Sequence, residues 1–410
     1  MNKDDLLSLL YVHQVHPEEL LQIALATFGA GAYKSENEFV CHRLGEPPAL
    51  HFVFKESELQ TVKPGDGLLN EDISKIQDKI RTDLLDLTRK IVGRMILFSF
   101  YPVAGHIRVG EFIQICPVPI HAPRPNDPTE GDHPFLIEFE VFDSPNLSIR
   151  INRIYSHAQR LSLFLGVIAE GLVMLPNTSS HFRWVTRNDP KSQYEHLLEG
   201  YGYSEFQRQQ DFFTECNDMP LLELVEDKQY FARMGCEIGR PLQLPKSFHQ
   251  LINIFRNLDP PRQNKFLRAA YWYSLAQMQE SSSARFLHLI QAIETLVPPA
   301  DVREECPACK RELIGPTKRF IELLDRLVPA HSELSRARKQ FYKFRSDLSH
   351  GRDICGRDLG VNHVPKSADQ TMLVFEAYQL ARLALINWLN GQAPQSEASN
   401  KADAGPDCVT

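Results

Sequence analysis

The sequence predicts an α+β N-terminal domain followed by an all-α helical bundle. The first half mixes strand-like alternation with helical periodicity, whereas apolar residues from position 261 onward recur only at helical spacing. A chain of 410 residues also exceeds the usual length of one domain. We therefore expect an α+β domain over 1–176, a connecting region of short helices over 177–260, a helical bundle over 261–391 and a disordered, apolar-poor tail over 392–410.

The N-terminal elements follow from the spacing of their apolar residues. Isoleucines and leucines between 73 and 91 recur at three- and four-residue steps, which predicts a helix closed by Gly93. The apolar segments MILFSFYPV and EFIQICPVPI predict two strands. In residues 137–141, apolar side chains alternate with two glutamates, as in a strand with one buried face. An amphipathic helix is expected next, with its apolar stripe over 154–172.

The second half is expected to be helical throughout. Its aromatic and aliphatic residues fall on single faces, and short polar or proline-containing segments separate the periodic stretches. We predict about five helices, which cover 265–277, 286–297, 320–327, 341–348 and a last long segment, SADQTMLVFEAYQLARLALINWLNG, that ends at Gly391.

Charge is distributed unevenly along the chain. Residues 251–391 carry 20 Lys and Arg against 15 Asp and Glu, whereas the remainder carries 25 against 37. A phosphate-bearing partner would therefore prefer the C-terminal part, although so modest an excess is also typical of a solvated surface. The motifs GxxxxGK[ST] and HExxH do not occur, which argues against P-loop nucleotide hydrolysis and zincin proteolysis.

The sequence also indicates a cytoplasmic protein without membrane contact. It has no stretch of about 18 uncharged apolar residues. Its first residues, MNKDDLLSLLYVHQ, place acids where a signal peptide would carry bases. The eight cysteines are scattered over a long chain, which favours reduced thiols.

The segment FYKFRSDLSHGRD contains the candidate catalytic pair Arg345 and His350. On a helix these residues lie about 140° apart, with Ser346 on the arc between them. Gly351 is expected to end the helix and so to place the imidazole at its negative end, which favours the protonated ring. The opposite face carries apolar residues that should lie in the core: Phe341, Phe344 and Leu348.

The spacing of this pair is not sufficient evidence by itself. Arg326 and His331 stand at the same separation, but Pro329 interrupts the helix between them, so they share no fixed face. The helical context of Arg345 and His350 therefore carries the prediction.

Here the sequence resembles a known family. The pattern Y-x-x-R-S-D-L-S-H-G at the end of a helix, preceded by RFLHLIQAIETLV with its Glu294, resembles the HEPN superfamily and, within it, the Apea-like HEPN group over about 261–391. The resemblance implies an endoribonuclease that needs no metal or other cofactor and works as a homodimer or higher oligomer. Its cleft would join the Arg-x4-His segments of two protomers, and its products would carry a 2′,3′-cyclic phosphate and a 5′-hydroxyl.

The chemistry of the two side chains agrees with that implication. RNA cleavage without metal needs a base, an acid and a cation near the phosphorus. His350 can transfer the protons, and Arg345 can bind the phosphate through two nitrogens. The resemblance further implies a defence or toxin effector, in which the N-terminal domain senses a trigger ligand or protein or selects the RNA.

Neighbouring residues are assigned supporting roles. The chain departs from many active members at Ser346, where they have Asn, Asp or His, and at Arg352, where some have Tyr. With Asp347, these two residues support the site, and Arg352 could add a phosphate contact. Four bases are expected either to bind the RNA backbone or to form a solvated helix face: Arg336, Arg338, Lys339 and Lys343.

Cys306 and Cys309 form a CxxC pair that resembles half of a zinc knuckle. A structural zinc ion needs four ligands, and Cys355, His331 and His363 are conceivable additions. The pair alone is a weak signal, so a structural zinc is one alternative and reduced, unliganded thiols are the other.

Two other functions remain open. The first is a non-catalytic HEPN module that binds RNA, a nucleotide or a protein partner, in which Arg345 pairs with an acid and His350 only caps a helix. The second is a regulatory adaptor stabilised by zinc.

Overall fold

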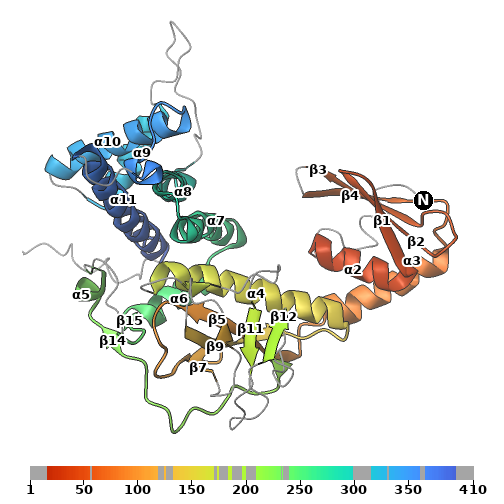
Figure 1. The fold of residues 1–410 in the computed structure, drawn as a ribbon. Coiled ribbons are helices and arrows are strands. Elements are labelled where there is room, and N and C mark those ends of the chain that lie inside the picture. The colour runs from red at the N-terminus through yellow and green to blue at the C-terminus, as the bar shows by residue number, and fades with distance from the viewer. Residues whose placement is uncertain are drawn as a thin grey trace, which may run out of the picture.

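The computed structural model describes most of the chain in thirteen segments, and it combines a sheet-rich N-terminal part with a helical C-terminal part (Figure 1). The described residues are 16–55, 58–118, 124–125, 133–169, 173–174, 183–186, 196–199, 209–231, 233, 240–298, 315–329, 332–360 and 365–393.

The N-terminal unit, residues 16–85, has its own hydrophobic core. Its four strands form an antiparallel sheet in the order β1-β2-β3-β4. Apolar side chains on one sheet face, such as Phe39 and Phe52, are buried with residues of the helices, such as Ile23 and Ile76. The elements are α2 (Pro17–Phe28), β1 (Ala30–Ser35), β2 (Glu38–His42), β3 (Leu50–Lys55), β4 (Glu58–Pro64), α3 (Asn70–Lys79) and the π-helical turn η1 (Ile80–Leu85).

The helix predicted over 73–91 is shorter than expected. It ends with η1 at Leu85, and Ile91 already belongs to strand β5 (Lys90–Ser99). Gly93 is not a helix cap: it lies inside β5, where a Cβ atom would come within 2.7 Å of the Phe139 ring. The helical spacing of apolar residues extends to Ile91 because β5 is buried on both faces and is rich in apolar residues at consecutive positions.

The central sheet forms the middle of the molecule. Its strands follow the order β10-β5-β9-β7-β6, and β13 pairs with β5 on the same sheet. The strands β7 (Ile113–Pro117) and β9 (His133–Phe142) fall where the sequence predicts them. The others are β6 (Ile107–Val109), β10 (Val173–Met174) and β13 (Gln209–Gln210).

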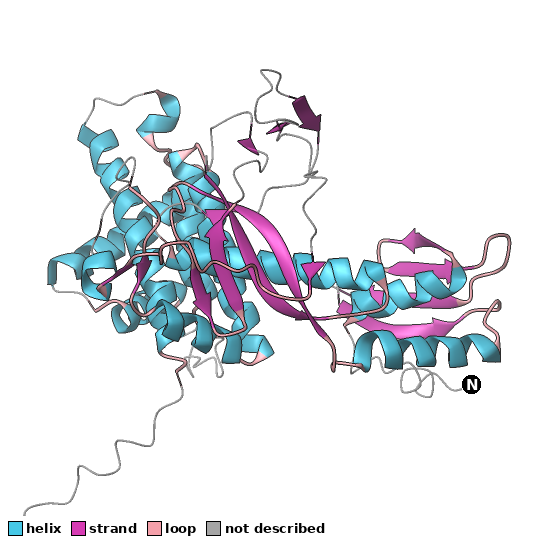
Figure 2. Ribbon diagram, turned by 90° about the horizontal axis from the view of Figure 1, so that it is seen from below, coloured by secondary structure: helices cyan, strands magenta, loops and turns pink. Residues whose placement is uncertain are grey.

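Helix α4 (Leu147–Ile168) covers one face of this sheet and runs between the bundle and the N-terminal unit (Figure 2). Asn146 caps it by accepting bonds from the amides of Ser148 and Ile149. On the opposite sheet face, Cys216 packs against Ile96, Phe98 and Cys116. Both faces are therefore covered, and Glu138 is fully buried rather than solvent-facing as its alternation with apolar residues predicted.

Short strands form two smaller sheets. Three strands form a separate sheet: β8 (Arg124–Pro125), β11 (Arg183–Thr186) and β12 (His196–Glu199). A parallel pair, β14 (Leu224–Val225) and β15 (Leu244–Pro245), flanks α5 (Asp227–Phe231).

The C-terminal part contains the expected series of helices. Their bounds are α6 (Phe248–Asn257), α7 (Pro260–Met278), α8 (Ser282–Thr295), α9 (Pro316–Leu327), α10 (Ser332–Ser349), the 3-10 turn η2 (Gly356–Leu359) and α11 (Pro365–Asn390). None of the described helices is long and apolar enough to cross a lipid bilayer.

The central sheet and the helices share one continuous hydrophobic core. Phe164 of α4 packs against Phe255 of α6 and Phe266 of α7, with ring centroids 4.9 and 6.3 Å away. The helices on both sides of position 260, α6 and α7, thus contribute to the same core, although the sequence places a boundary between them. Directly before α6, the described residues form short elements, and Leu222, Leu242 and Leu244 among them are buried in this core.

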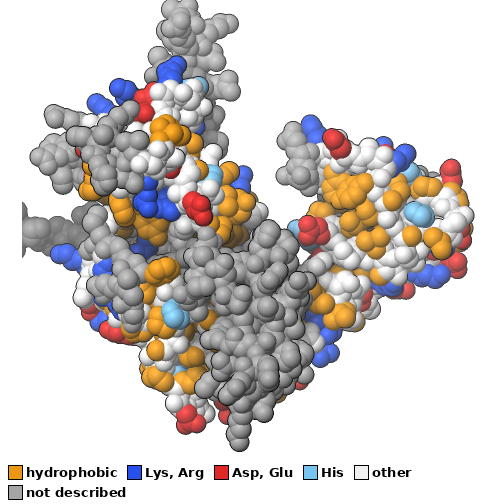
Figure 3. Space-filling model, viewed as in Figure 1, with side chains coloured by type: hydrophobic (Ala, Val, Ile, Leu, Met, Phe, Trp, Pro, Cys, Tyr) orange, Lys and Arg blue, Asp and Glu red, His pale blue; other side chains and the backbone are white. Residues whose placement is uncertain are grey.

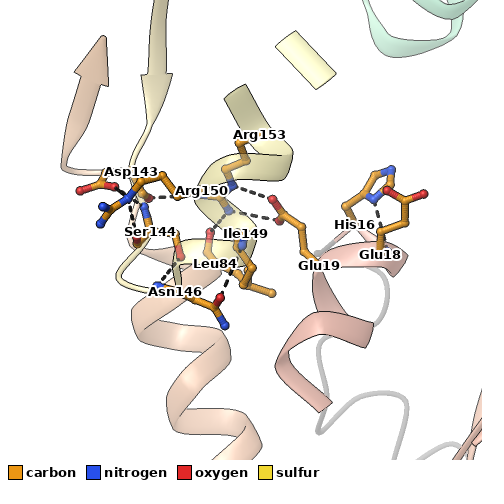
Figure 4. A network of polar contacts seen from close by, with 10 residues as sticks. All are labelled: His16, Glu18, Glu19, Leu84, Asp143, Ser144, Asn146, Ile149, Arg150 and Arg153. Atoms are coloured by element: carbon orange, nitrogen blue, oxygen red, sulfur yellow. Dashed lines mark hydrogen bonds and ion pairs between the residues drawn. The ribbon is translucent and has the colours of Figure 1, made fainter. Parts of the chain in front are cut away.

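A polar joint fixes the N-terminal unit to α4 (Figure 4). Arg153 donates two hydrogen bonds to Glu19 of α2, at 2.6 and 3.1 Å, and one to the carbonyl of Asp143 at 3.1 Å. Arg150 binds the carboxylate of the same aspartate at 2.5 Å. Ile149, on the same helix, is buried in the N-terminal core.

Candidate functional site

The candidate catalytic segment lies at the C-terminal end of α10. Gly351 has a φ of +65° and donates to the carbonyl of Leu348 at 3.1 Å, and the amide of Arg352 donates to the carbonyl of Asp347 at 2.8 Å. These bonds close the helix in the left-handed conformation that glycine favours. The predicted cap at Gly351 is therefore confirmed, and it places His350 at the last carbonyls of the helix.

Arg345 forms an ion pair with Glu294 of α8. Its Nη2 lies 3.3 Å from Oε2 of the glutamate, and the two side chains are 32% and 26% exposed. The guanidinium also lies 5.7 Å from the centroid of the Tyr342 ring. Residues on two helices thus hold the charged group, while part of it stays accessible to solvent.

The remaining residues of the segment differ in exposure. His350 is exposed, and its side chain has no partner among the residues that the structure describes. Ser346 and Asp347 are half-buried, and Arg352 is exposed. An imidazole and a partly accessible guanidinium therefore stand near the end of one helix, five positions apart in the chain.

The opposite face of α10 is anchored in the core, as expected. Phe341 and Phe344 are buried, and both rings pack against Phe286 of α8, with centroids 6.1 and 4.9 Å away. Leu348 packs against the same core. This packing fixes the rotation of α10 and directs Arg345 toward Glu294.

One of the four bases expected to bind RNA is placed differently by the structure. Arg338 is fully buried and binds the carboxylate of Asp325 on α9 and the carbonyl of Val328, the C-cap residue of that helix. It lies three residues before Phe341, on the apolar face of the helix, so it cannot contact an RNA backbone in this conformation. Lys339 and Lys343 are exposed as expected, and the side chain of Arg336 lies outside the described residues.

The loop after His350 is bound to the start of α8. The carboxylate of Asp358 accepts bonds from the amides of Ser282 and Ser283, at 2.7 and 2.9 Å, and from the Ser281 hydroxyl at 3.0 Å. Burial alone would raise the pKa of Asp358, but the bonds from these serines outweigh it and lower the pKa. Asp358 thus accepts the hydrogen bonds of backbone amides that have no partner within the helix, and its negative charge is favourable at this helix N-terminus.

A second set of bonds ties the same loop to α11. The amide of Gly356 donates to the Gln370 side chain at 2.9 Å, and Gln370 donates to the carbonyl of Ile354 at 3.2 Å. Sequence reasoning found neither Asp358 nor Gln370, because each acts on backbone groups that are distant in the chain.

The residues of the predicted zinc site lie mostly outside the described part of the chain. Cys306, Cys309, His331 and His363 lie outside the described residues. Cys355 is buried, and burial raises the pKa of its thiol. Within the described segments, no cluster of three or more His, Cys, Asp or Glu side chains could hold a metal ion. The zinc site stays a prediction.

The arrangement supplies two chemical functions. The accessible side of Arg345 can bind an anionic oxygen, and His350 can accept or donate a proton.

Comparison of the chain with protein-family models, with curated proteins and with solved structures found no match in any of the three.

Proposed function

We propose that the C-terminal bundle is a HEPN-type endoribonuclease that cleaves RNA through Arg345 and His350 without a metal ion. The observation that carries the proposal is the position of Arg345, which Glu294 holds partly exposed on the helix that ends at the exposed His350. A positioned cation and a proton-transfer group are the parts that this reaction requires.

The proposed reaction is an internal phosphoryl transfer. A His350 imidazole takes the proton of the 2′-hydroxyl, and the 2′-oxygen forms a bond to phosphorus. The bond to the 5′-oxygen then breaks, and that oxygen takes up a proton. Arg345 compensates the negative charge that accumulates on the non-bridging oxygens. The products are a 2′,3′-cyclic phosphate and a 5′-hydroxyl.

The proton transfers favour a dimer. One imidazole cannot accept the first proton and donate the second one in a concerted step, whereas two copies of His350 can. Large apolar side chains are also exposed in the chain that follows the motif, and apolar side chains are visible on the bundle surface in Figure 3. They are Ile354, Leu359, Met372 and Phe375.

A role as a defence or toxin effector is part of the same proposal. It rests on the resemblance of the motif to Apea-like HEPN proteins. The N-terminal unit would then sense a trigger or select the RNA, and the joint between Glu19 and Arg153 would connect it to α4. Growth arrest on expression of the wild-type protein, absent with His350→Ala, is the expected result.

The second candidate is a non-catalytic HEPN module that binds RNA, a nucleotide or a protein. The ion pair between Arg345 and Glu294 favours it, because a carboxylate on the guanidinium competes with a phosphate. The two candidates differ in whether RNA is cut.

The test is a cleavage assay on single-stranded RNA in the presence of EDTA. We expect the wild-type protein to cut the RNA, and Arg345→Ala and His350→Ala each to abolish cleavage. Arg326→Ala is the matched control, because Arg326 is an exposed arginine of α9 in a pair with the same spacing. RNA binding without cleavage by the wild type would favour the second candidate.

A further inference from the structure

A second cationic cluster lies away from the Arg345 segment, where α4, α6 and the β6–β7 turn meet. It consists of His157 and Arg160 on α4 and Arg256 on α6. The His157 ring stacks on Phe139, with centroids 5.1 Å apart, and meets the Phe112 ring edge-on at 5.9 Å. Arg256 lies over the same Phe112 ring, 4.8 Å from its centroid.

The two arginines have no carboxylate partner among the described residues. Arg160 donates to the side-chain oxygen of Gln263 on α7, and Arg256 lies over the face of the Phe112 ring. Two acids in the adjoining elements are already compensated: Asp259 pairs with Arg262 at 3.3 Å, and Glu140 pairs with Lys90 at 2.8 Å. The β6–β7 turn also carries the exposed Glu111, so two guanidinium groups stand against one further acid and the cluster keeps a net positive charge.

The arginines remain available to a ligand. A guanidinium has five N–H donors, and Arg160 uses one of them on an amide oxygen. None of its nitrogens is among the buried atoms without a partner, and its side chain stays partly exposed. Arg256 is exposed, and the Phe112 ring covers one face of its guanidinium, whereas no described residue accepts a hydrogen bond from its N–H edges.

The pKa of His157 is lowered by its burial and by the positive charge of the two arginines. Burial and, to a smaller extent, the charges of Arg160 and Arg256 together bring this pKa down to about 4. Burial also lowers the pKa of Arg160. Carboxylates would oppose both effects, and no carboxylate in the described part of the chain contributes at either residue.

We propose that Arg160 and Arg256, with His157 beside them, form a binding site for a phosphate ester. Two guanidinium groups from separate helices supply the paired N–H donors through which arginine binds the oxygens of a phosphate. The phosphate comes either from an RNA strand or from a free nucleotide. The inference does not depend on whether Arg345 and His350 cleave RNA.

The experiment measures binding to three probes at fixed salt. Calorimetry is used for inorganic phosphate and 5′-AMP, and fluorescence anisotropy for a labelled single-stranded RNA. The RNA is 2′-O-methylated, so it cannot be cleaved by attack of its own 2′-hydroxyl. The variants are Arg256→Gln, Arg160→Gln and the double variant, and Arg262→Gln is the control because it lies nearby with its own acid.

We expect the double variant to bind at least about tenfold more weakly, because each charge-assisted contact contributes at least that factor. The control should stay within about twofold of the wild type. Loss with 5′-AMP and phosphate identifies a free phosphate ester, and loss with RNA alone identifies the strand. Unchanged binding of all probes, no binding by the wild type, or an equal loss in Arg262→Gln would overturn the proposal. If the double variant does not fold, the affinity of Arg256→Gln for the same probes tests the proposal, because Arg256 is exposed and its replacement should leave the fold intact.

Discussion

Arg345 of α10 and Glu294 of α8 form an ion pair with 3.3 Å between Nη2 and Oε2, although 51 positions separate them in the chain. The pair joins the helix that carries the candidate site to the helix whose start is bound by Asp358. Glu294 thus acts as a positioning residue for Arg345 in the proposed ribonuclease, and this role leads to the first prediction.

Replacement of Glu294 should reduce turnover more than it reduces RNA affinity. Glu294→Gln keeps the size of the side chain but removes the charge that orients the guanidinium, so we expect kcat to fall about tenfold or more while KM changes little. Steady-state cleavage kinetics measure both constants. Glu294→Asp should restore part of kcat, and Glu322→Gln on α9, an exposed glutamate, should change neither constant. A rise in KM alone would contradict the positioning role.

Arg338 should contribute to stability rather than to RNA binding. Its removal leaves the carbonyl of Val328 and the carboxylate of Asp325 without their donor. We expect Arg338→Ala to lower the free energy of unfolding by about 2 kcal/mol. Lys339→Ala, at the exposed neighbour, should cost less than about 0.5 kcal/mol and weaken RNA binding instead. Urea unfolding and anisotropy on the same two variants separate the effects.

Glu138 should hold the segment 209–216 on the central sheet. Its buried carboxylate forms an ion pair with Arg94 at 3.0 Å and accepts a hydrogen bond from the backbone amide of Thr214 at 2.7 Å. It also accepts bonds from the side-chain amides of Gln114 and Gln210, at 3.1 and 2.9 Å. We expect Glu138→Ala to cost about 3 kcal/mol and to speed hydrogen exchange at Thr214. Glu140→Ala on the same strand, which loses only the exposed pair with Lys90, should cost less than about 1 kcal/mol. Equal costs would contradict this account.

Stability should fall in mildly acidic solution because of His157. Burial lowers its folded-state pKa from 6.5 to about 4, so between these values only the unfolded chain binds the proton. Its contribution is therefore complete above pH 6.5 and is lost as the pH falls toward 4. Urea unfolding should show about 2 kcal/mol less stability at pH 5 than at pH 7 from this group.

His157→Phe keeps a ring against Phe139 and removes the titrating group, so its stability should change less between these two pH values. An equal pH dependence in wild type and His157→Phe would contradict the assignment.

Asp358 acts in a lower pH range than His157. Its lowered pKa means that its contribution to stability is lost only as the pH falls below about 3.8.

The sequence predicts those features that depend on local spacing. Helices α7, α8, α10 and α11 have clear apolar periods, and the cap at Gly351 follows from a glycine after the last helical turn. The strands β1 to β4 are short and lack a clear alternation, and we did not predict them. Their pairing is set by contacts between strands, such as Phe39 opposite Phe52.

The errors share one physical cause, which is the influence of residues distant in the chain. Arg338 lies on a basic helix, but Asp325 on α9 supplies the partner that allows its burial. Glu138 alternates like an exposed residue, but the segment around Thr214 covers it. The arginine of the candidate site was predicted from its motif, whereas its pairing with Glu294 required the packing of α8 against α10.

The most direct test of the central claim is the chemistry of the RNA ends. Mass spectrometry of the products that the wild-type protein forms in EDTA should show 2′,3′-cyclic phosphate and 5′-hydroxyl ends, and His350→Ala should form none. Products with 5′-phosphate ends, or the same products from His350→Ala, would contradict the assignment of cleavage to Arg345 and His350.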